Sequence, residues 1–414
     1  MRRHRIWPVA LVVPGVLLIA GSFGFKSWVL PEMTKFPTNL DVNAAYEGTV
    51  TLYVDPATKA PLAEPQVLPL SVERSVKADA DLSTGELVVV RETLNLKSSG
   101  LFDSVQEHQY VMDRETHANV AGPEAWAYNS LNPVDRAGAF YVSFGMRWDT
   151  AQGMPVYKGE IDGTYVASPA GTSEIDGLEV ATVAAAEDWT PVVDAYLSDL
   201  DRSMALPRQL TLDEMKPLLA GQGLDLDAVL TGLLPKLTPE DLQSLLLLAG
   251  QPIPLQYLQR FEGTTSVDPI TGAPVDVSDV SETLGAVPAD AWVGALTTTL
   301  AKYPDVPEAV TLKTAVESTA TNPIPIFAND YRQTEASVAE AVADAKENGN
   351  KLHLGETVIP NTMLFLGLGM TVLGLVLILI PRRGEGGHEP EHDVPPPAPA
   401  EEAEDTSEKE LVHT

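Results

Sequence analysis

The stretch that decides the architecture is residues 359–383, which read IPNTMLFLGLGMTVLGLVLILIPRR. Residues 362–380 carry no charge, and at about 1.5 Å of rise per residue they make a helix of roughly 28 Å, close to the hydrocarbon thickness of a bilayer. Arg382 and Arg383 follow directly, and short loops rich in Arg or Lys stay on the cytoplasmic side of a membrane. We therefore predict a transmembrane helix whose C-terminal end is cytoplasmic, with the preceding chain outside.

A second apolar run lies near the N-terminus, over residues 6–25, behind the basic cluster of Arg2, Arg3 and Arg5. Its length suits a span, and the basic cluster predicts a cytoplasmic N-terminus. The alternative is a signal peptide cleaved at the small residues 20–22. We favour a retained helix, because apolar side chains continue beyond this point.

Composition excludes several classes of function. The 414 residues carry a formal net charge of -31, with 58 acidic side chains and no cysteine. A surface this acidic repels phosphate backbones, and we therefore expect no nucleic-acid partner. The absence of cysteine removes disulfides, thiolate zinc sites and cysteine nucleophiles.

Between the two apolar runs, alternating apolar residues with Gly, Pro and Asp punctuation predict a sheet. The predicted strands are 47–54, 86–96, 108–112, 139–148, 154–167 and 178–184, and strands are expected to resume around 264–280 and 309–318. Helices are predicted at 289–302 and 335–348, the second capped by Thr334 and closed by Gly349.

One motif occurs twice. Residues 46–49 (YEGT) lead to 54–61 (VDPATKAP), and residues 261–264 (FEGT) lead to 267–274 (VDPITGAP). Asp-Pro opening a tight turn predicts two equivalent hairpins in one sheet, with the same side chains facing the core. A metal-binding loop built on the two Asp residues is the alternative.

A helical insertion is predicted over residues 190–257. Residues 211–214 (TLDE) form a capping box, and residues 238–241 (TPED) combine an N-cap Thr with Pro at the first helical position. Leucines cover more than one face here, so the helices must be buried or must meet something apolar. Two interpretations stay open, a buried helical subdomain and a lipid-binding wall, and the candidate ligand-binding residues are Leu230, Leu234, Leu242, Leu245, Leu246 and Leu248.

No catalytic signature is present. The sequence lacks a phosphate loop, a zinc-protease helix and a nucleophile elbow. His108 and His117 are expected at the surface without a third metal ligand, and the Asp-x-Asp pairs at 79/81, 199/201 and 225/227 are expected in so acidic a chain. We therefore predict no enzyme, catalytic residue, metal or cofactor, while paired carboxylates for glycoside hydrolysis stay a spatial question.

The chain resembles a known family. The repeated hairpin motif, residues 110–116 (YVMDRET) and residues 329–334 (NDYRQT) are similar to the porin-A-like family of actinobacterial cell-envelope membrane proteins, formerly a domain of unknown function. The resemblance implies a role in maturation of lipomannan and lipoarabinomannan. The layout of spans also resembles class B scavenger receptors, which pass lipid through a tunnel, although their disulfides and glycosylation sites are missing here. An outer-membrane barrel has no such terminal helices, so we do not expect a pore.

These observations predict an α+β protein of the plasma membrane, with a large, mostly antiparallel exterior domain anchored by one transmembrane helix at each end. The expected function is non-catalytic binding or transfer of an envelope lipid or lipoglycan in support of lipoglycan assembly. The alternative is a scaffold or regulator of membrane glycosyltransferases, and an enzyme acting on glycans comes third. The expected parts are a cytoplasmic N-terminus (1–5), helix 6–30, the exterior domain 31–358 with its insertion 190–257, helix 359–381 and a disordered acidic cytoplasmic tail (382–414).

Overall fold

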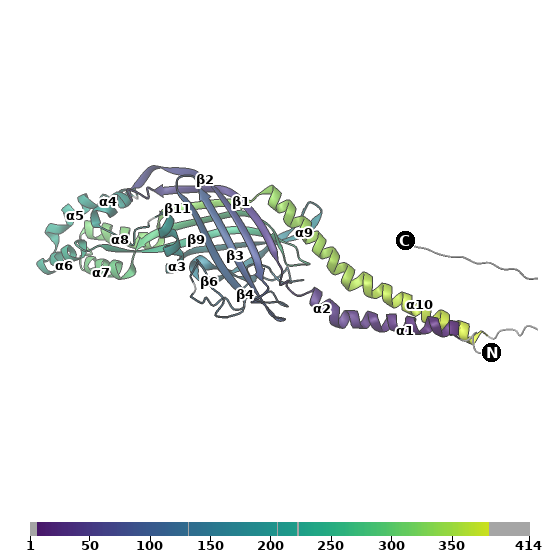
Figure 1. Cartoon of the computed structure of the whole chain (residues 1–414). Helices are drawn as coiled ribbons and strands as arrows, with labels where there is room; N and C mark the ends of the chain where they lie inside the picture. The colour runs from purple at the N-terminus through teal and green to yellow at the C-terminus, as the bar shows by residue number, and fades with distance from the viewer. Residues whose placement is uncertain (1–5, 131, 205, 222, 381–414) are drawn as a thin grey trace, which may run out of the picture. The chain divides into compact units, whose positions relative to one another are not determined.

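The computed structural model describes residues 6–130, 132–204, 206–221 and 223–380 (Figure 1). The chain divides into two units, one made of residues 1–20 and 364–414 and the other of residues 21–363. The predictions that lie outside the described residues are those for Arg2, Arg3, Arg5, Arg382, Arg383 and the acidic tail 382–414.

The first unit contains most of two apolar helices, α1 (Ile6–Gly24) and α10 (Ile359–Leu379). Residues 21–24 of α1 and residues 359–363 of α10 belong to the second unit. The helical stretches Pro8–Met33 and Glu335–Leu379 are long and apolar enough to cross a membrane, which confirms one such helix near each end. Glycines lie at the contact, where a β-carbon on Gly374 would stand 2.9 Å from the carbonyl oxygen of Pro8. Small residues allow this approach of two backbones in a membrane.

The helix before α10 does not end where the sequence predicted. α9 (Glu335–His353) continues through a π-helical turn, η5 (Leu354–Val358), into α10, so Gly349 does not close it. The turn directly precedes Pro360, which lacks an N–H, and a widened turn accommodates such a gap. The first helix similarly continues through η2 (Phe25–Val29) into α2 (Leu30–Met33).

The second unit contains one large sheet in the order β4-β3-β2-β1-β11-β10-β9-β7-β6-β5, with β8 paired to β9. Every neighbouring pair is antiparallel. This confirms the predicted α+β class. The strands are β1 (Asp41–Val54), β2 (Pro61–Asp79), β3 (Leu87–Ser98), β4 (Phe102–Asp113), β5 (Met154–Lys158), β6 (Gly163–Ile175), β7 (Leu178–Pro191), β8 (Gln209–Leu210), β9 (Ile253–Val267), β10 (Pro274–Pro288) and β11 (Ile324–Gln333).

Three strand predictions were wrong. Residues 139–148 are irregular apart from a bridge at Phe140, residues 154–167 are the β5–β6 hairpin, and residues 309–318 lie in a helix. The long strand β2 was not predicted. Its prolines at 61, 65 and 69 interrupt the alternation that identifies a strand from sequence.

The irregular segment between β4 and β5 connects the two edge strands of the sheet. Trp126 pairs with Gln109 of β4, and Phe140 pairs with Val156 of β5. Within the segment the amide of Asn119 donates to the carbonyl of Ala139 at 2.8 Å. Backbone hydrogen bonds therefore run from one edge of the sheet to the other, and the inward faces of the strands surround a common interior.

The repeated motif forms two hairpins, β1–β2 and β9–β10, as predicted. The Asp55 carboxylate accepts from the amide of Ala57, and the Asp268 carboxylate accepts from the amide of Ile270. Tyr46 and Phe261, the equivalent aromatic residues, line the same interior cavity. Because the Asp oxygens accept from the backbone of their own turns, the duplication is explained by turn structure.

Helices gather at one end of the sheet (Figure 1). They come from two chain segments, since α7 and α8 between β10 and β11 pack with the helices of the predicted insertion around one apolar core. α3 lies apart from this group, and its Asp199 accepts from the Gln106 amide of β4 at 2.7 Å. The helices are α3 (Asp194–Met204), α4 (Leu212–Gly221), α5 (Leu226–Leu233), η4 (Leu234–Lys236), α6 (Pro239–Ala249), α7 (Asp290–Leu300) and α8 (Pro307–Thr321).

The outward side of the sheet is strongly polar. Charged side chains are exposed at positions spread over its strands: Glu47, Glu73, Arg91, Lys97, Asp103, Glu179, Glu262, Asp330 and Arg332. A sheet that crosses a bilayer needs an apolar outer band, because charges on the lipid face are destabilising. These strands are therefore built to face water.

Candidate functional site

The six predicted leucines do not form one surface. Leu230, Leu245 and Leu248 line an apolar pocket among the helices. Leu242 and Leu246 lie instead on an open depression of α6, where Leu246 is 57% exposed. Leu234 begins η4 and is half-buried.

The pocket that the first three leucines line is called here the helical pocket. It has a volume of about 70 Å³, and its wall also includes Trp292 of α7, Leu312 of α8 and Thr319. The Thr319 hydroxyl donates to the carbonyl of Ala315 at 2.8 Å, so the polar atom of this side chain is already engaged. The remaining surface is almost wholly hydrocarbon, so an apolar group is its natural occupant.

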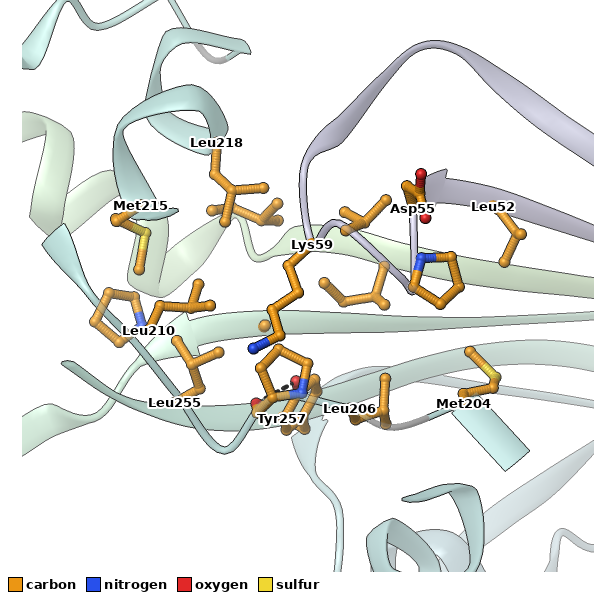
Figure 2. A pocket seen from close by; sticks show the side chains of 17 residues that line it. Leu52, Asp55, Lys59, Met204, Leu206, Leu210, Met215, Leu218, Leu255 and Tyr257 are labelled. Atoms are coloured by element: carbon orange, nitrogen blue, oxygen red, sulfur yellow. Dashed lines mark hydrogen bonds between the residues drawn. The ribbon is translucent and has the colours of Figure 1, made fainter. Parts of the chain in front are cut away.

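A second pocket, called here the hairpin pocket, lies where the β1–β2 turn meets α4 (Figure 2). Its volume is about 30 Å³. Apolar side chains make up most of its wall, and Lys59 and Asp55 of the turn supply charged groups. Met215 and Pro288 belong to the walls of both pockets, so the two apolar spaces adjoin.

A cavity of about 240 Å³ lies between the inward faces of the strands and is called here the tyrosine cavity. Tyrosines line it from several strands and from the irregular segment between β4 and β5, which is called here the closing segment: Tyr46, Tyr110, Tyr128, Tyr141, Tyr157, Tyr165 and Tyr331. A smaller cavity of about 60 Å³ shares Gln106, Glu160, Glu282 and Asn329 with it. This interior was not predicted, because the adjacency of inward faces depends on strand order.

The charges in the tyrosine cavity are paired. Arg74 donates through Nε to the Glu92 carboxylate at 2.6 Å, and the Tyr110 hydroxyl donates to Glu92 at 2.8 Å. Burial has the largest single effect on the pKa of Glu92 and raises it, but the charges of Arg74 and His108 together with the hydrogen bonds from Arg74 and Tyr110 outweigh burial and hold that pKa below its usual range. Lys158 lies 2.6 Å from Glu282, whose pKa is raised because burial exceeds the effect of this ammonium.

Apolar core residues separate the tyrosine cavity from the hairpin pocket. Met204 and Tyr257 line the hairpin pocket, whereas Tyr196 and Phe327 line the smaller cavity beside the tyrosine cavity. All four belong to one packed cluster. The interior is therefore a series of cavities, with packed side chains between its apolar and polar parts.

Both histidines predicted at the surface are buried, so that prediction was wrong. His108 lines the tyrosine cavity, and burial lowers its pKa. Its Nδ1 has no hydrogen-bond partner among the described residues. His117 bonds through Nδ1 to the Ser143 hydroxyl at 2.9 Å, and burial lowers its pKa to about 4. Both imidazoles are thus uncharged at neutral pH.

The carboxylate pairs carry structural contacts. Asp79 accepts from the amides of Asp81 and Leu82, and Asp225 caps α5 by accepting from the amide of Ala228. In the described part of the chain, no three side chains of the His, Asp or Glu type gather in a position to hold a metal ion. The candidate site is therefore a set of enclosed cavities that offer space for a ligand.

Comparison with models of protein families finds a match over most of the chain. The model of a family described as "Porin PorA" matches residues 7–376. No curated protein matches the chain. The matched range includes both apolar helices, the sheet and the helical end.

Proposed function

This chain belongs to the porin PorA family, whose model matches residues 7–376, and from that premise we propose that it is a non-catalytic protein of the cell envelope that binds or transfers an envelope lipid or lipoglycan. The observation that carries the proposal is the pair of adjoining apolar pockets at the helical end. Burying apolar surface is favourable by roughly 25 cal/mol per Å², so an acyl chain is the natural occupant of such walls. The resemblance to the porin-A-like family implies support of lipoglycan assembly as the cellular role.

The two pockets share part of their wall. Met215 and Pro288 contribute to both, and a methionine side chain has three rotatable bonds and adapts to irregular spaces. This adaptable residue supports the proposal that the apolar space adjusts to its ligand.

The family name suggests a pore, but the polar outward side of the sheet favours a domain that lies outside the membrane. Its outward side carries charges such as Glu73, Arg91 and Asp330 in the middle of strands. Placing them against lipid costs about 2–4 kcal/mol for a basic residue at the bilayer midplane. We therefore propose an exterior domain at residues 31–358, including the insertion 190–257, outside the plasma membrane.

The proposed topology has both termini in the cytoplasm and a retained first helix. Its support includes Ser22, at the alternative cleavage site, whose hydroxyl donates to the carbonyl of Pro360 at 2.8 Å. A β-carbon on Gly21 would lie 2.7 Å from Met363 Cε. Cleavage after Ser22 would remove Gly21 and Ser22, and with them both of these contacts to α10.

A pocket-filling variant tests the lipid proposal. Ala249 lines the helical pocket, and Ala249→Phe would occupy its space, whereas Leu247→Phe places the same aromatic ring on the exposed face of α6. We expect the purified full chain to carry extractable lipid, the Ala249→Phe protein to lose most of it and the Leu247→Phe protein to keep it. Equal lipid in all three proteins would contradict the proposal.

A scaffold for membrane glycosyltransferases is the alternative that the same experiment addresses. One face of α9, including Val342 and Ala345, packs against Val180 and Val275 of the sheet, so this face is covered within the chain itself. If Ala249→Phe empties the pocket while lipoglycan assembly and co-purifying transferases stay unchanged, the scaffold is favoured. Loss of assembly with partners intact favours lipid handling.

A further inference from the structure

Four tyrosine hydroxyls around the tyrosine cavity make no hydrogen bond to any other residue that the structure describes. They belong to Tyr46 of β1, Tyr165 of β6, and Tyr128 and Tyr141 of the closing segment. Burial raises the pKa of Tyr128 and Tyr141, so these hydroxyls keep their protons at neutral pH and can donate. Polar groups inside a protein are normally hydrogen-bonded, so the fold leaves unused bonding capacity around this one space.

The rings of the same tyrosines give the cavity apolar faces beside these hydroxyls. The ring of Tyr141 stacks on that of Tyr110, with centroids 5.1 Å apart, and the ring of Tyr165 meets Phe261 edge-on at 4.8 Å. A tyrosine presents an apolar body and a polar tip, so the wall offers hydrocarbon and hydroxyl side by side. Water satisfies only the hydroxyls, whereas a ligand with both C–H and O–H groups matches the whole wall.

The charged groups in and beside the cavity are paired with one another. Arg74 bonds to Glu92 at 2.6 Å. Lys158 lies 2.6 Å from Glu282 and 3.3 Å from Glu160. Carboxylates thus outnumber the cationic groups in this set, so an acidic ligand is repelled, while a cationic ligand has to compete with bound ammonium and guanidinium groups. The groups left free are neutral, which favours a neutral ligand.

We propose that the tyrosine cavity binds one neutral pyranose ring, whose C–H groups pack on the tyrosine rings and whose hydroxyls bond to the tyrosine hydroxyls. Drug-sized ligands occupy pockets of about 300–1,000 Å³, so a cavity of about 240 Å³ suits a single sugar ring with no alkyl chain inside it. The inference deepens the function proposed above and rests on it, because the pyranose corresponds to the sugar part of a lipoglycan.

Saturation-transfer NMR on the full chain in phosphatidylcholine nanodiscs tests this proposal. Nanodiscs are needed because alkyl glucoside and maltoside detergents themselves carry a pyranose. The probes are the methyl pyranosides of glucose, mannose and galactose, with methyl glucuronide as the acidic analogue. The test variant combines Tyr141→Phe with Tyr165→Phe, which removes two hydroxyls and keeps both rings. The matched control is Tyr53→Phe, since Tyr53 lies in β1 outside the cavity wall.

We expect at least one neutral pyranoside to bind and the acidic analogue to bind more weakly. The double variant should lose about tenfold in affinity for the neutral pyranoside, while Tyr53→Phe should lose none. Equal affinity in the double variant and the control would overturn the role of the tyrosine hydroxyls. Failure of every neutral pyranoside to bind would overturn the proposal and leave water as the occupant.

Mass spectrometry of the ligand that the purified chain carries identifies the source of the sugar. A glycolipid that is lost in the double variant would make the pyranose the head of a lipid, and a sugar without lipid would make it a free saccharide. Lipid that carries no sugar and stays bound to the double variant would overturn the sugar site and leave the lipid-binding function intact.

Discussion

Gly15 and Gly367 face each other across the pair of apolar helices. A β-carbon on Gly367 would lie 2.6 Å from the carbonyl oxygen of Gly15, and one on Gly15 would lie 2.8 Å from that of Gly367. Neither position has room for a side chain. The contact depends on two glycines that are far apart in sequence, so it makes the pairing of the two helices testable.

Gly367→Leu should separate the helices, because its side chain would meet the backbone of α1. The chain has no cysteine, so spin labels at Val9→Cys of α1 and Val372→Cys of α10, both exposed side chains, can report the distance between the helices in membranes. We expect a short distance that Gly367→Leu lengthens. Gly369→Leu is the control, since a β-carbon on Gly369 meets nothing within 4 Å. Equal distances in both variants would show that the helices do not pair through Gly367.

The contact of α6 with the loop after α7 should weaken in acid. The ammonium of Lys302 and then the hydroxyl of Tyr303 bond to the Asp241 carboxylate at 2.6 and 2.7 Å and lower its pKa to about 2. Since the ordinary pKa of Asp is about 3.9, the stabilisation is complete above about pH 4 and is lost as the pH falls towards about 2.

Hydrogen exchange of the α6 amides measures this effect. We expect Asp241→Asn to speed exchange at neutral pH and to remove its dependence on pH between about 4 and about 2. Glu240→Gln, in the same first turn, should behave as the wild-type chain does. A pH dependence that survives in Asp241→Asn would assign it to another group.

The duplicated turns should respond differently to the same kind of change. A β-carbon on Gly272 would lie 2.1 Å from the carbonyl oxygen of Gly145, so Gly272→Ala should lower the free energy of unfolding by more than about 2 kcal/mol. Lys59 occupies the equivalent position with φ +58°, and Lys59→Gly relieves this strain but frees the unfolded chain, so it should change that free energy by less than about 0.5 kcal/mol. Urea denaturation distinguishes the two, and similar losses would argue against the packing described for Gly272.

Arg136 should hold the closing segment to the sheet. It is 1% exposed, donates to the carbonyls of Gln109 and Trp126 at 2.9 and 3.0 Å, and lies over the ring of Tyr110 at 4.1 Å. Arg136→Met should therefore lower the free energy of unfolding by about 3 kcal/mol.

Proteolysis shows where this loss occurs. We expect Arg136→Met to expose the segment between β4 and β5 to trypsin before the rest of the sheet, because its link to both edges is weakened. Arg332→Met is the control, since Arg332 lies in an exposed pair with Glu47 at 3.3 Å. Cleavage elsewhere at the same rate would mean that Arg136 stabilises the domain as a whole.

Local signals in the sequence were reliable guides. The capping box of α4 forms as predicted, with the Glu214 amide donating to the Thr211 hydroxyl at 3.3 Å. Thr238 and Thr334 cap α6 and α9 in the same way. These features involve residues three apart, so a single sequence contains all the information that they need.

Features that depend on distant strands were missed. Strand β2 was hidden by its prolines, and residues 309–318 form part of helix α8 because the helical core accepts their apolar face. The histidines were misplaced for the same reason. In the sequence His108 is an isolated polar residue. In the structure the closing segment covers it, and the ring of Tyr128 packs against the imidazole.

The two apolar helices, the alternation that makes a sheet and the paired turns can be read from the chain alone, because each follows from the spacing of neighbouring residues. Three-dimensional packing is needed to know which leucines meet Trp292, which tyrosines share a cavity and that Lys59 reaches an apolar pocket. The reason is physical. Cavities lie between side chains that strand order and helix packing bring together from distant parts of the chain, and these contacts leave no periodic signature along it.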